Sequence, residues 1–591
     1  MAGWKQQMAE TARKNRVELV EAKLTRRDLF KMGLLTSSGF LVAKMGLSSR
    51  NATAGGAVVS PPTTPWIEEM PVPPVAKPMQ VSDLPGPAPE QYCNTAAGER
   101  GRPDGHQFWE MYDPANMDFY LNDNRATKAS WHRELPLDDV WLFNGMFPGP
   151  RIHAHYDRPV MIRFCNNLPS LADHKGYGRP TPTTHLHNGH TESESDGNPL
   201  DMIDDSGSAT SALGGCWKDH FYLNKRAGFT DPKFGPQGDM RETMTTLWYH
   251  DHCLDFTAQN VYRGNMGLYY IFNEFDTGDE NDSNPNAWRL PSGNFDVPLV
   301  FHDRVFDPQG KGYFDLFNLD GIIGDKMTVN GKIQPFFRVA RRKYRFRAQN
   351  IGTSRFYNFF LSNGQTMTQL SHDGNMLPKP LTVRNFRIAV AQRVDIIIDF
   401  SKLASGTQLY LVNCQEQKDG RGPTGKILPV ALGTKMLKFI VDGTLDATDN
   451  SRIPTKFFDL PPVNRAEAVT ERTFVFDRTN GGWSVNGKQF DEHVITASPR
   501  QGTAEIWNIV NNSGGWMHPV HIHFEEHQIL SRNGKTPPAD EIAREDVIWL
   551  GHGETVQTFR RFRDFLGRYP THCHNVVHED HAMMFMWKIV P

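Results

Sequence analysis

The chain has 591 residues, of which 38 % are hydrophobic, 50 are glycine and 40 are proline, and its formal net charge is −3. One hydrophobic core rarely supports so long a chain, so about two to four domains are expected. The small net charge gives no electrostatic case for nucleic-acid binding. Six widely scattered cysteines are too few to form a disulfide framework.

The first 54 residues have the features of an export signal. Arg26-Arg27 is a twin-arginine motif, residues 32–47 are mildly apolar, and Ala52-Thr53-Ala54 supplies the small residues that a signal peptidase accepts. The apolar stretch contains Lys44 and is too short for a membrane-spanning helix, and no later run approaches the necessary length. Residues 1–54 are therefore predicted to be a signal peptide for the twin-arginine export machinery. The mature protein is expected to be soluble, in the periplasm or outside the cell.

The rest of the chain reads as short strands and turns. A proline-rich leader covers residues 55–109, and alternating runs such as 160–164, bounded by Asn and Gly-Pro signals, are typical of antiparallel sheets. Polar linkers, rich in Asp, Asn and Pro, separate three blocks, each long enough for one β-sandwich. We therefore predict an all-β chain with three similar domains, at residues 110–275, 290–445 and 465–591.

Histidines occur in pairs spaced two residues apart. Because residues i and i+2 of a strand lie on one face, each pair aims two imidazoles at the same place, where they could hold one metal ion or two. One pair lacks the aromatic and glycine context of the others and is interpreted as structural. The pairs are the excluded His153/His155, then His185/His187, His250/His252, His521/His523 and His572/His574.

The last cluster is the most specific one. Cys573 lies between His572 and His574, so its side chain points to the opposite face from theirs. With His578 five residues later, Met583 ten residues later and His518 upstream, it completes the cysteine, two-histidine and thioether set of a blue-copper site. Zinc also accepts Cys and His, but a structural zinc site needs neither the thioether nor eight more converging histidines. Copper is therefore favoured.

These motifs resemble those of the multicopper oxidases, in particular the three-domain bacterial laccase, spore-coat laccase and bilirubin oxidase group. The resemblance extends from about residue 110 to Pro591. It rests on four stretches: His185-Leu186-His187-Asn188-Gly189, Trp248-Tyr249-His250-Asp251-His252, Gly514-Gly515-Trp516-Met517-His518-Pro519-Val520-His521-Ile522-His523 and Tyr569-Pro570-Thr571-His572-Cys573-His574.

The resemblance implies three cupredoxin-like Greek-key β-sandwich domains and four copper ions, with a trinuclear cluster shared by the outer domains and the middle domain as a spacer. Type 1 copper would be bound by His518, Cys573 and His578, with Met583 as axial ligand and Met584 as the alternative. Type 2 copper would be bound by His185 and His521. The type 3 pair would be bound by His187, His250, His252, His523, His572 and His574.

The resemblance also suggests two acids that serve proton delivery. Glu579, next to ligand His578, is similar to the acidic residue that the family places near the dioxygen site, and Asp196 is similar to a second acid near type 2 copper. The alternative for each is a solvated loop acid. Trp516, two residues before His518, either packs against that imidazole or belongs to the ordinary core.

The implied reaction takes electrons one at a time from a donor and reduces dioxygen to water. The donor is expected to be a phenol, an aromatic amine or a tetrapyrrole. The alternative is a metal oxidase acting on Mn(II), Fe(II) or Cu(I). The 22 methionines form no dense run, which disfavours Cu(I). Glu525 with Glu526, or Asp201 with Asp204 and Asp205, could serve Mn(II) or Fe(II), but solvated loop acids are the preferred interpretation of both groups. A nitrite-reductase-like or non-enzymatic copper protein is a remote alternative, because neither requires the full histidine set.

Overall fold

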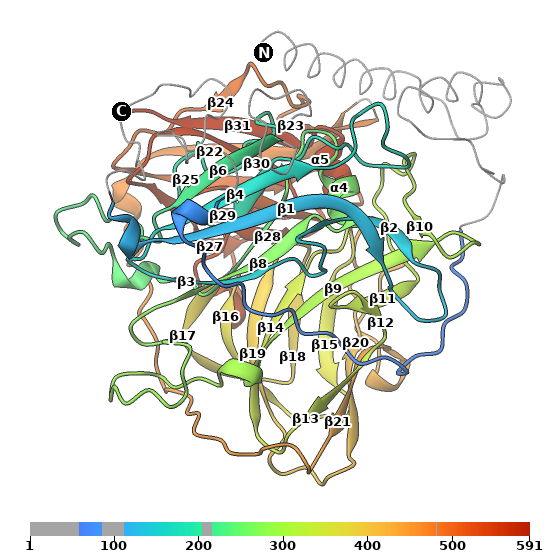
Figure 1. Ribbon diagram of the computed structural model, residues 1–591. Coiled ribbons are helices and arrows are strands. Elements are labelled where there is room, and N and C mark those ends of the chain that lie inside the picture. The colour runs from blue at the N-terminus through green and yellow to red at the C-terminus, as the bar shows by residue number, and fades with distance from the viewer. Residues whose placement is uncertain (1–57, 85–111, 204–215, 480) are drawn as a thin grey trace, which may run out of the picture.

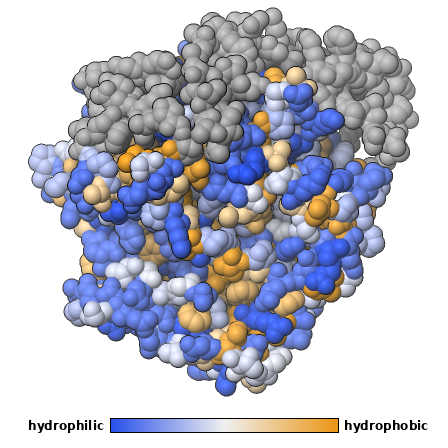
Figure 2. All heavy atoms as spheres, viewed as in Figure 1, coloured by the Kyte–Doolittle hydropathy of each residue, from blue (hydrophilic) through white to orange (hydrophobic). Residues whose placement is uncertain are grey.

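The computed structural model describes residues 58–84, 112–203, 216–479 and 481–591 (Figure 1). The predicted signal peptide, residues 1–54, and much of the leader lie outside the described residues. Among the described residues, no helix is long and apolar enough to cross a membrane. Hydrophilic side chains dominate the face drawn in Figure 2, where the apolar ones form small groups.

The first domain is a sandwich of two four-stranded sheets, with strand orders β2-β1-β4-β6 and β3-β8-β7-β5. Its core side chains come from both sheets, among them Ile152, Ile162 and Tyr249. Its strands are β1 (Asp118–Ala129), β2 (Asp138–Phe143), β3 (Arg151–His155), β4 (Val160–Asn167), β5 (Thr184–His187), β6 (Cys216–Tyr222), β7 (Thr246–Asp251) and β8 (Met266–Phe272).

The middle domain pairs a large sheet, ordered β12-β11-β9-β14-β19-β16-β17 with β10 beside β9, with the five-stranded sheet β13-β21-β20-β15-β18. It forms the lower part of the molecule in Figure 1, below the other two domains. Its strands are β9 (Asp296–Phe306), β10 (Gly312–Tyr313), β11 (Lys326–Val329), β12 (Lys332–Ile333), β13 (Phe336–Val339), β14 (Lys343–Asn350), β15 (Tyr357–Leu361), β16 (Met367–His372), β17 (Asn375–Val383), β18 (Asn385–Ile388), β19 (Arg393–Asp399), β20 (Gln408–Asn413) and β21 (Thr434–Val441).

The third domain pairs the sheets β23-β22-β25-β29-β27 and β24-β31-β30-β26-β28. Along β22, side chains that are more and less exposed alternate, as in a strand with one face towards solvent, whereas β26 is buried throughout. Its strands are β22 (Ala468–Thr479), β23 (Gly482–Val485), β24 (Ile495–Ala497), β25 (Thr503–Asn511), β26 (His518–Ile522), β27 (Gln528–Arg532), β28 (Val547–Leu550), β29 (Thr555–Phe562), β30 (Gly567–Cys573) and β31 (Met584–Ile589).

Two short helices join the outer domains. α4 (Thr257–Arg263) follows β7, and α5 (Val576–Asp580) follows β30. They pack against each other (Figure 1), and the backbone N–H of Ala258 donates to both carboxylate oxygens of Asp580 at 3.2 Å. α4 ends at Gly264, where φ is +118° and a Cβ atom would lie 2.5 Å from a side-chain carbon of Leu142, so glycine is required there.

The described part of the leader is an extended N-terminal strap, residues 58–84. The backbone N–H of Met70 donates to Phe336 of the middle domain at 2.7 Å, and the N–H of Met79 donates to Phe119 of the first domain at 2.8 Å. The strap therefore holds two domains together before the first strand begins.

Candidate metal centre

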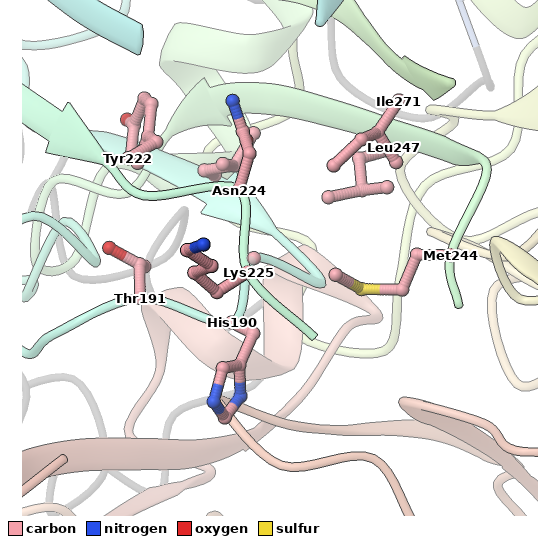
Figure 3. Close-up of a pocket in the computed structure, with 10 residues that line it drawn as sticks. His190, Thr191, Tyr222, Asn224, Lys225, Met244, Leu247 and Ile271 are labelled. Carbon is pink, nitrogen blue, oxygen red and sulfur yellow. The ribbon is translucent and has the colours of Figure 1, made fainter. Parts of the chain in front are cut away.

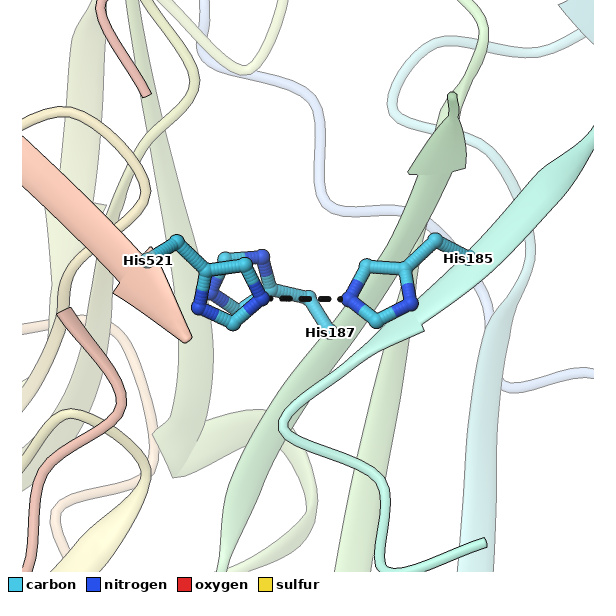
Figure 4. Close-up of side chains that lie close together, drawn as sticks. All are labelled: His185, His187 and His521. Atoms are coloured by element: carbon cyan, nitrogen blue, oxygen red, sulfur yellow. Dashed lines mark hydrogen bonds between the residues drawn. The ribbon is translucent and has the colours of Figure 1, made fainter. Parts of the chain in front are cut away.

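Four strands bring the histidine pairs together between the first and third domains. β5 and β7 are neighbours, with His185 opposite His250 in register. β26 and β30 are neighbours, with His521 opposite His572. Figure 4 shows His185 and His187 from β5 meeting His521 from β26, so the two domains share one site.

His185 and His521 face each other across the domain boundary, with their Nε2 atoms 3.2 Å apart (Figure 4). Nδ1 of His185 donates to the carbonyl of Asp196 at 2.5 Å, and Nδ1 of His521 donates to the carbonyl of Asp546 at 2.9 Å. Because both Nδ1 atoms carry the proton, both Nε2 atoms present lone pairs. Two lone pairs at this distance repel each other unless a cation lies between them.

His252, His523 and His572 form a second group, which two carboxylates orient. The oxygens of Glu579 lie 3.1 Å from Nδ1 of His252 and 2.9 Å from Nδ1 of His572. A carboxylate oxygen of Asp196 lies 2.7 Å from Nδ1 of His523. Nε2 of His523 is 3.2 Å from Nε2 of each of the other two histidines. The carboxylates thus fix the ring orientations and turn three lone pairs to one point.

His187, His250 and His574 form a third group, with one nitrogen of each within 4.8 Å of the others. Nδ1 of His250 donates to the carbonyl of Asp251 at 2.7 Å, and Nε2 of His187 lies 2.9 Å from the carboxylate of Asp546. Both ring nitrogens of His574 are buried without a hydrogen-bond partner among the described residues. Buried polar atoms rarely lack partners, so these nitrogens indicate a ligand.

The fourth group is His518, Cys573 and His578, all buried. Sγ of Cys573 lies 3.3 Å from Nδ1 of His518 and 3.5 Å from Nδ1 of His578, and the two nitrogens are 3.2 Å apart. Met583 belongs to the same core cluster as Cys573, whereas Met584 packs in a different one. The structure thus brings the thiol, two imidazoles and one thioether into one region.

Burial sets the protonation of these groups. It lowers the pKa of His518 to about 3, and it raises the pKa of the Cys573 thiol well above its usual range. Burial alone would raise the pKa of Glu579, but His572 and His252 hold that pKa well below its ordinary value. The site therefore offers a neutral imidazole at His518, an ionised carboxylate at Glu579, and a thiol that a metal ion would deprotonate.

Comparison with known proteins identifies the family. Three family models described as multicopper oxidase match residues 125–195, 310–429 and 461–591. A laccase of Bacillus subtilis (strain 168) is 31 % identical over 502 residues, which cover 77 % of this chain and 90 % of that protein. This chain belongs to the multicopper oxidase family.

Other relatives agree with that membership. A bilirubin oxidase of Albifimbria verrucaria is 29 % identical, covering 76 % of this chain and 73 % of that protein. The crystal structure of a laccase from Pediococcus acidilactici has a TM-score of 0.68 at 21 % identity, covering 91 % of this chain and 96 % of that one. The predicted all-β fold of cupredoxin-like sandwiches is confirmed.

Family membership makes the chain a copper-binding oxidase that uses dioxygen and an electron donor, as predicted. The donor set fits the metal, because imidazole and thiolate both suit copper. The facing lone pairs and the unpartnered nitrogens of His574 give this fit a structural basis. The remote reductase-like and non-enzymatic alternatives are therefore set aside.

Other residues singled out in the sequence lie apart from these groups. His153 and His155 pack against Phe272, with ring centroids 5.0 and 5.7 Å away. Glu525 is paired with Arg563 at 2.8 Å, and Glu526 is paired with Arg544 at 3.3 Å. Their arginine partners make both glutamates poor cation ligands.

The second acidic group that was considered for a metal substrate is also unsuited. Asp201 is buried and paired with Lys218, and Asp204 and Asp205 lie outside the described residues. A pocket beside β5, lined by His190, Lys225 and Met244 among others (Figure 3), contains none of the predicted ligands. His190 itself is 2.8 Å from the carboxylate of Asp564.

The structure adds residues that the sequence did not indicate. Asp546 contacts His521 through its carbonyl and His187 through its carboxylate. Trp483 packs against His578, with ring centroids 3.8 Å apart, and against His518 at 5.6 Å. Trp516 contacts Trp483 at 5.3 Å. No motif surrounds Asp546 or Trp483 in the sequence, so no local pattern could have revealed them.

Proposed function

We propose that this oxidase binds four copper ions and oxidises phenols, aromatic amines or tetrapyrroles. His518, Cys573 and His578 would hold type 1 copper, with Met583 axial, and His185 and His521 would hold type 2 copper. The type 3 pair would be held by His187, His250, His252, His523, His572 and His574. The observation that supports this most strongly is the close approach of histidines from two domains. In three pairs of these histidines the Nε2 atoms lie 3.2 Å apart, with their lone pairs facing each other.

Copper held in this way would supply one-electron redox chemistry and four reducing equivalents for one dioxygen. The chain itself supplies the connection, because Cys573 is covalently bonded between His572 and His574. The carboxylate oxygens of Glu579 lie 3.1 and 2.9 Å from the Nδ1 atoms of His252 and His572, and Asp196 orients two other histidines through its carbonyl and its carboxylate. Both acids are buried next to the site where protons are consumed, which suits the predicted role in proton delivery.

The preference for organic donors has two supports. The laccases and the bilirubin oxidase are relatives along most of the chain. In addition, Glu525 and Glu526 are already paired with arginines, which weakens the case for Mn(II) or Fe(II). We also propose export through the twin-arginine machinery to the periplasm or beyond, based on Arg26-Arg27 and the residues that follow.

The proposal is tested on the purified, copper-loaded enzyme. Elemental analysis should give about four coppers per chain. Oxygen uptake should occur with 2,6-dimethoxyphenol or bilirubin and should be weaker with Cu(I), Fe(II) or Mn(II). Two coppers per chain would contradict the copper assignment. Oxygen uptake with the metal ions and with none of the organic donors would make the metal oxidase the correct alternative.

A further inference from the structure

A group of aromatic rings leads outward from the cysteine-containing site. Nδ1 of His578 faces Cys573, while Nε2 lies 3.1 Å from the carbonyl of Asp320 in the middle domain. The Trp483 ring lies on His578 at 3.8 Å and 32°, is 1 % exposed, and donates from Nε1 to the carbonyl of Leu319 at 2.8 Å. A bond from the middle domain thus fixes this tryptophan against the imidazole.

Trp516 extends this contact towards the surface. Its ring meets Trp483 edge-on, at 5.3 Å and 83°, and its side chain is half-buried. The guanidinium carbons of Arg421 and Arg478 each lie 4.7 Å from the centre of the Trp516 ring. Cations over an indole face are a favourable arrangement, which holds all three side chains in place.

The two arginines form the outer rim of this group. The carboxylate of Asp320 is 2.9 Å from Arg478 and 3.4 Å from Arg421. The Arg421 side chain is 51 % exposed and the Arg478 side chain 25 %. The two guanidinium groups outnumber the Asp320 carboxylate that they share, and the planar fork of N–H groups on a guanidinium suits pairing with a further carboxylate.

The rim is fixed by a contact between the middle and third domains and by close packing within the middle domain. The N–H of Met517 donates to the carbonyl of Arg421 at 2.8 Å. Gly321, with φ of +117°, and Gly420 approach so closely that a Cβ on Gly420 would lie 2.1 Å from the Gly321 oxygen. The loops that carry Asp320 and Arg421 are thus packed together and cannot easily separate.

We propose that Trp483 and Trp516 form the path for electron uptake to His578, and that Arg421 and Arg478 recognise an aromatic donor carrying an acidic group. This proposal rests on the proposed oxidation of aromatic donors and narrows it to anionic phenols. Electron transfer through protein slows steeply with distance, and ring contacts replace gaps that would otherwise have to be crossed. The rim places an anionic donor at the outer end of the rings.

The reaction balances as follows. Each phenol loses one electron through the rings and its hydroxyl proton to solvent, and leaves as a phenoxyl radical that keeps its carboxylate charge. Four such oxidations supply the electrons that, with four protons, convert one dioxygen to two water molecules. No tryptophan radical is required, because the rings serve as a medium for transfer.

Recognition is tested with syringate and its methyl ester, which share the phenol and differ in charge. The wild-type enzyme should have a lower KM for syringate, and this preference should shrink as salt is added. Arg421→Gln should raise the KM for syringate by about two- to fivefold, as should Arg478→Gln, since both charges are partly exposed, and should leave the KM for the ester unchanged. Equal effects on both donors would overturn the proposal.

Binding can be measured without turnover. The anion 3,4,5-trimethoxybenzoate lacks the phenolic hydroxyl, and its binding to the holoenzyme by calorimetry should weaken in the same arginine variants. If neither syringate nor its ester supports oxygen uptake, the proposed function fails, and this binding measurement still decides the recognition proposal. Undetectable binding to the wild-type enzyme would overturn it.

The path is tested by anaerobic stopped-flow measurements, in which loss of the visible absorption of the Cys573 copper site reports the rate of its reduction. Trp483→Leu should slow reduction by both donors several-fold, whereas Trp483→Phe, which keeps a ring, should retain most of the rate. Trp507→Leu is the matched control, because Trp507 is equally buried in the same domain and packs on Phe474. An unchanged reduction rate in Trp483→Leu, with its absorption spectrum intact, would overturn the path.

Discussion

Replacing Glu579 with glutamine removes one charge from the metal centre and keeps the shape of the side chain. The carboxylate is 2 % exposed and lies 3.1 and 2.9 Å from the Nδ1 atoms of His252 and His572. Glutamine can accept from one of these N–H groups but presents its own NH2 to the other. Loss of such a partner typically costs about 10- to 100-fold in metal affinity or activity, which corresponds to ~1.4 to 2.7 kcal/mol.

We therefore expect oxygen uptake by Glu579→Gln to fall by about 10- to 100-fold. The visible absorption of the Cys573 site should persist, because the carboxylate oxygens face His252 and His572 and not Cys573. The assay combines an oxygen electrode, copper analysis and an absorption spectrum. Copper analysis separates slower turnover from lost metal.

Asp580→Asn is the matched control for this variant. Asp580 is the next residue and is also buried, but its carboxylate accepts the N–H of Ala258. Asparagine retains an acceptor for that bond, so oxygen uptake should stay near the wild-type rate. Wild-type turnover by fully copper-loaded Glu579→Gln would refute the reasoning and remove Glu579 from the reaction.

Three further outcomes are expected. Met583→Leu should raise the potential of the type 1 site in a redox titration, because a thioether donates weakly to the oxidised metal, and Met584→Leu should leave it unchanged. Arg345→Met should lower the free energy of unfolding by about 3–5 kcal/mol in urea, since it removes the buried guanidinium that pairs with the carboxylates of Asp276 and Asp395. The copper-free protein should lose stability as pH falls from 6.5 towards 3, because unfolded histidine takes up a proton near 6.5 whereas the pKa of folded His518 is about 3. Equal urea midpoints at pH 7.5 and 5.5 would contradict this.

Most of the side chains that the structure brings together at the proposed metal centre could be predicted from the sequence, because they belong to local motifs. The spacing of two residues places both rings of the pair in β5 on one face, and the β5–β7 register then aligns His185 with His250. The alternation of side chains and the turn residues were likewise enough to predict three sandwiches. Periodicity does not reveal which strands of different domains meet, so the facing of His185 and His521 required the structure.

The residues that the sequence did not indicate are all distant in sequence from the histidines that they contact. Asp546 lies between two motifs, and Asp320 reaches His578 from the middle domain through its carbonyl, a group that every residue carries. Trp483 is 95 residues before His578, the imidazole on which it stacks. Conversely, Glu525 and Glu526 appeared available for cations because the arginines that pair with them come later in the chain. The middle domain is thus more than a spacer.

The division of the proposed ligands between the outer domains has a consequence for the order of events in biosynthesis. His185 and His521 are 336 positions apart, yet their rings face each other. A ribosome-bound chain that has completed its first domain holds four of the histidines, and their partners are still untranslated. Complete metal loading of the proposed site therefore requires that synthesis has finished and that the first and third domains have associated.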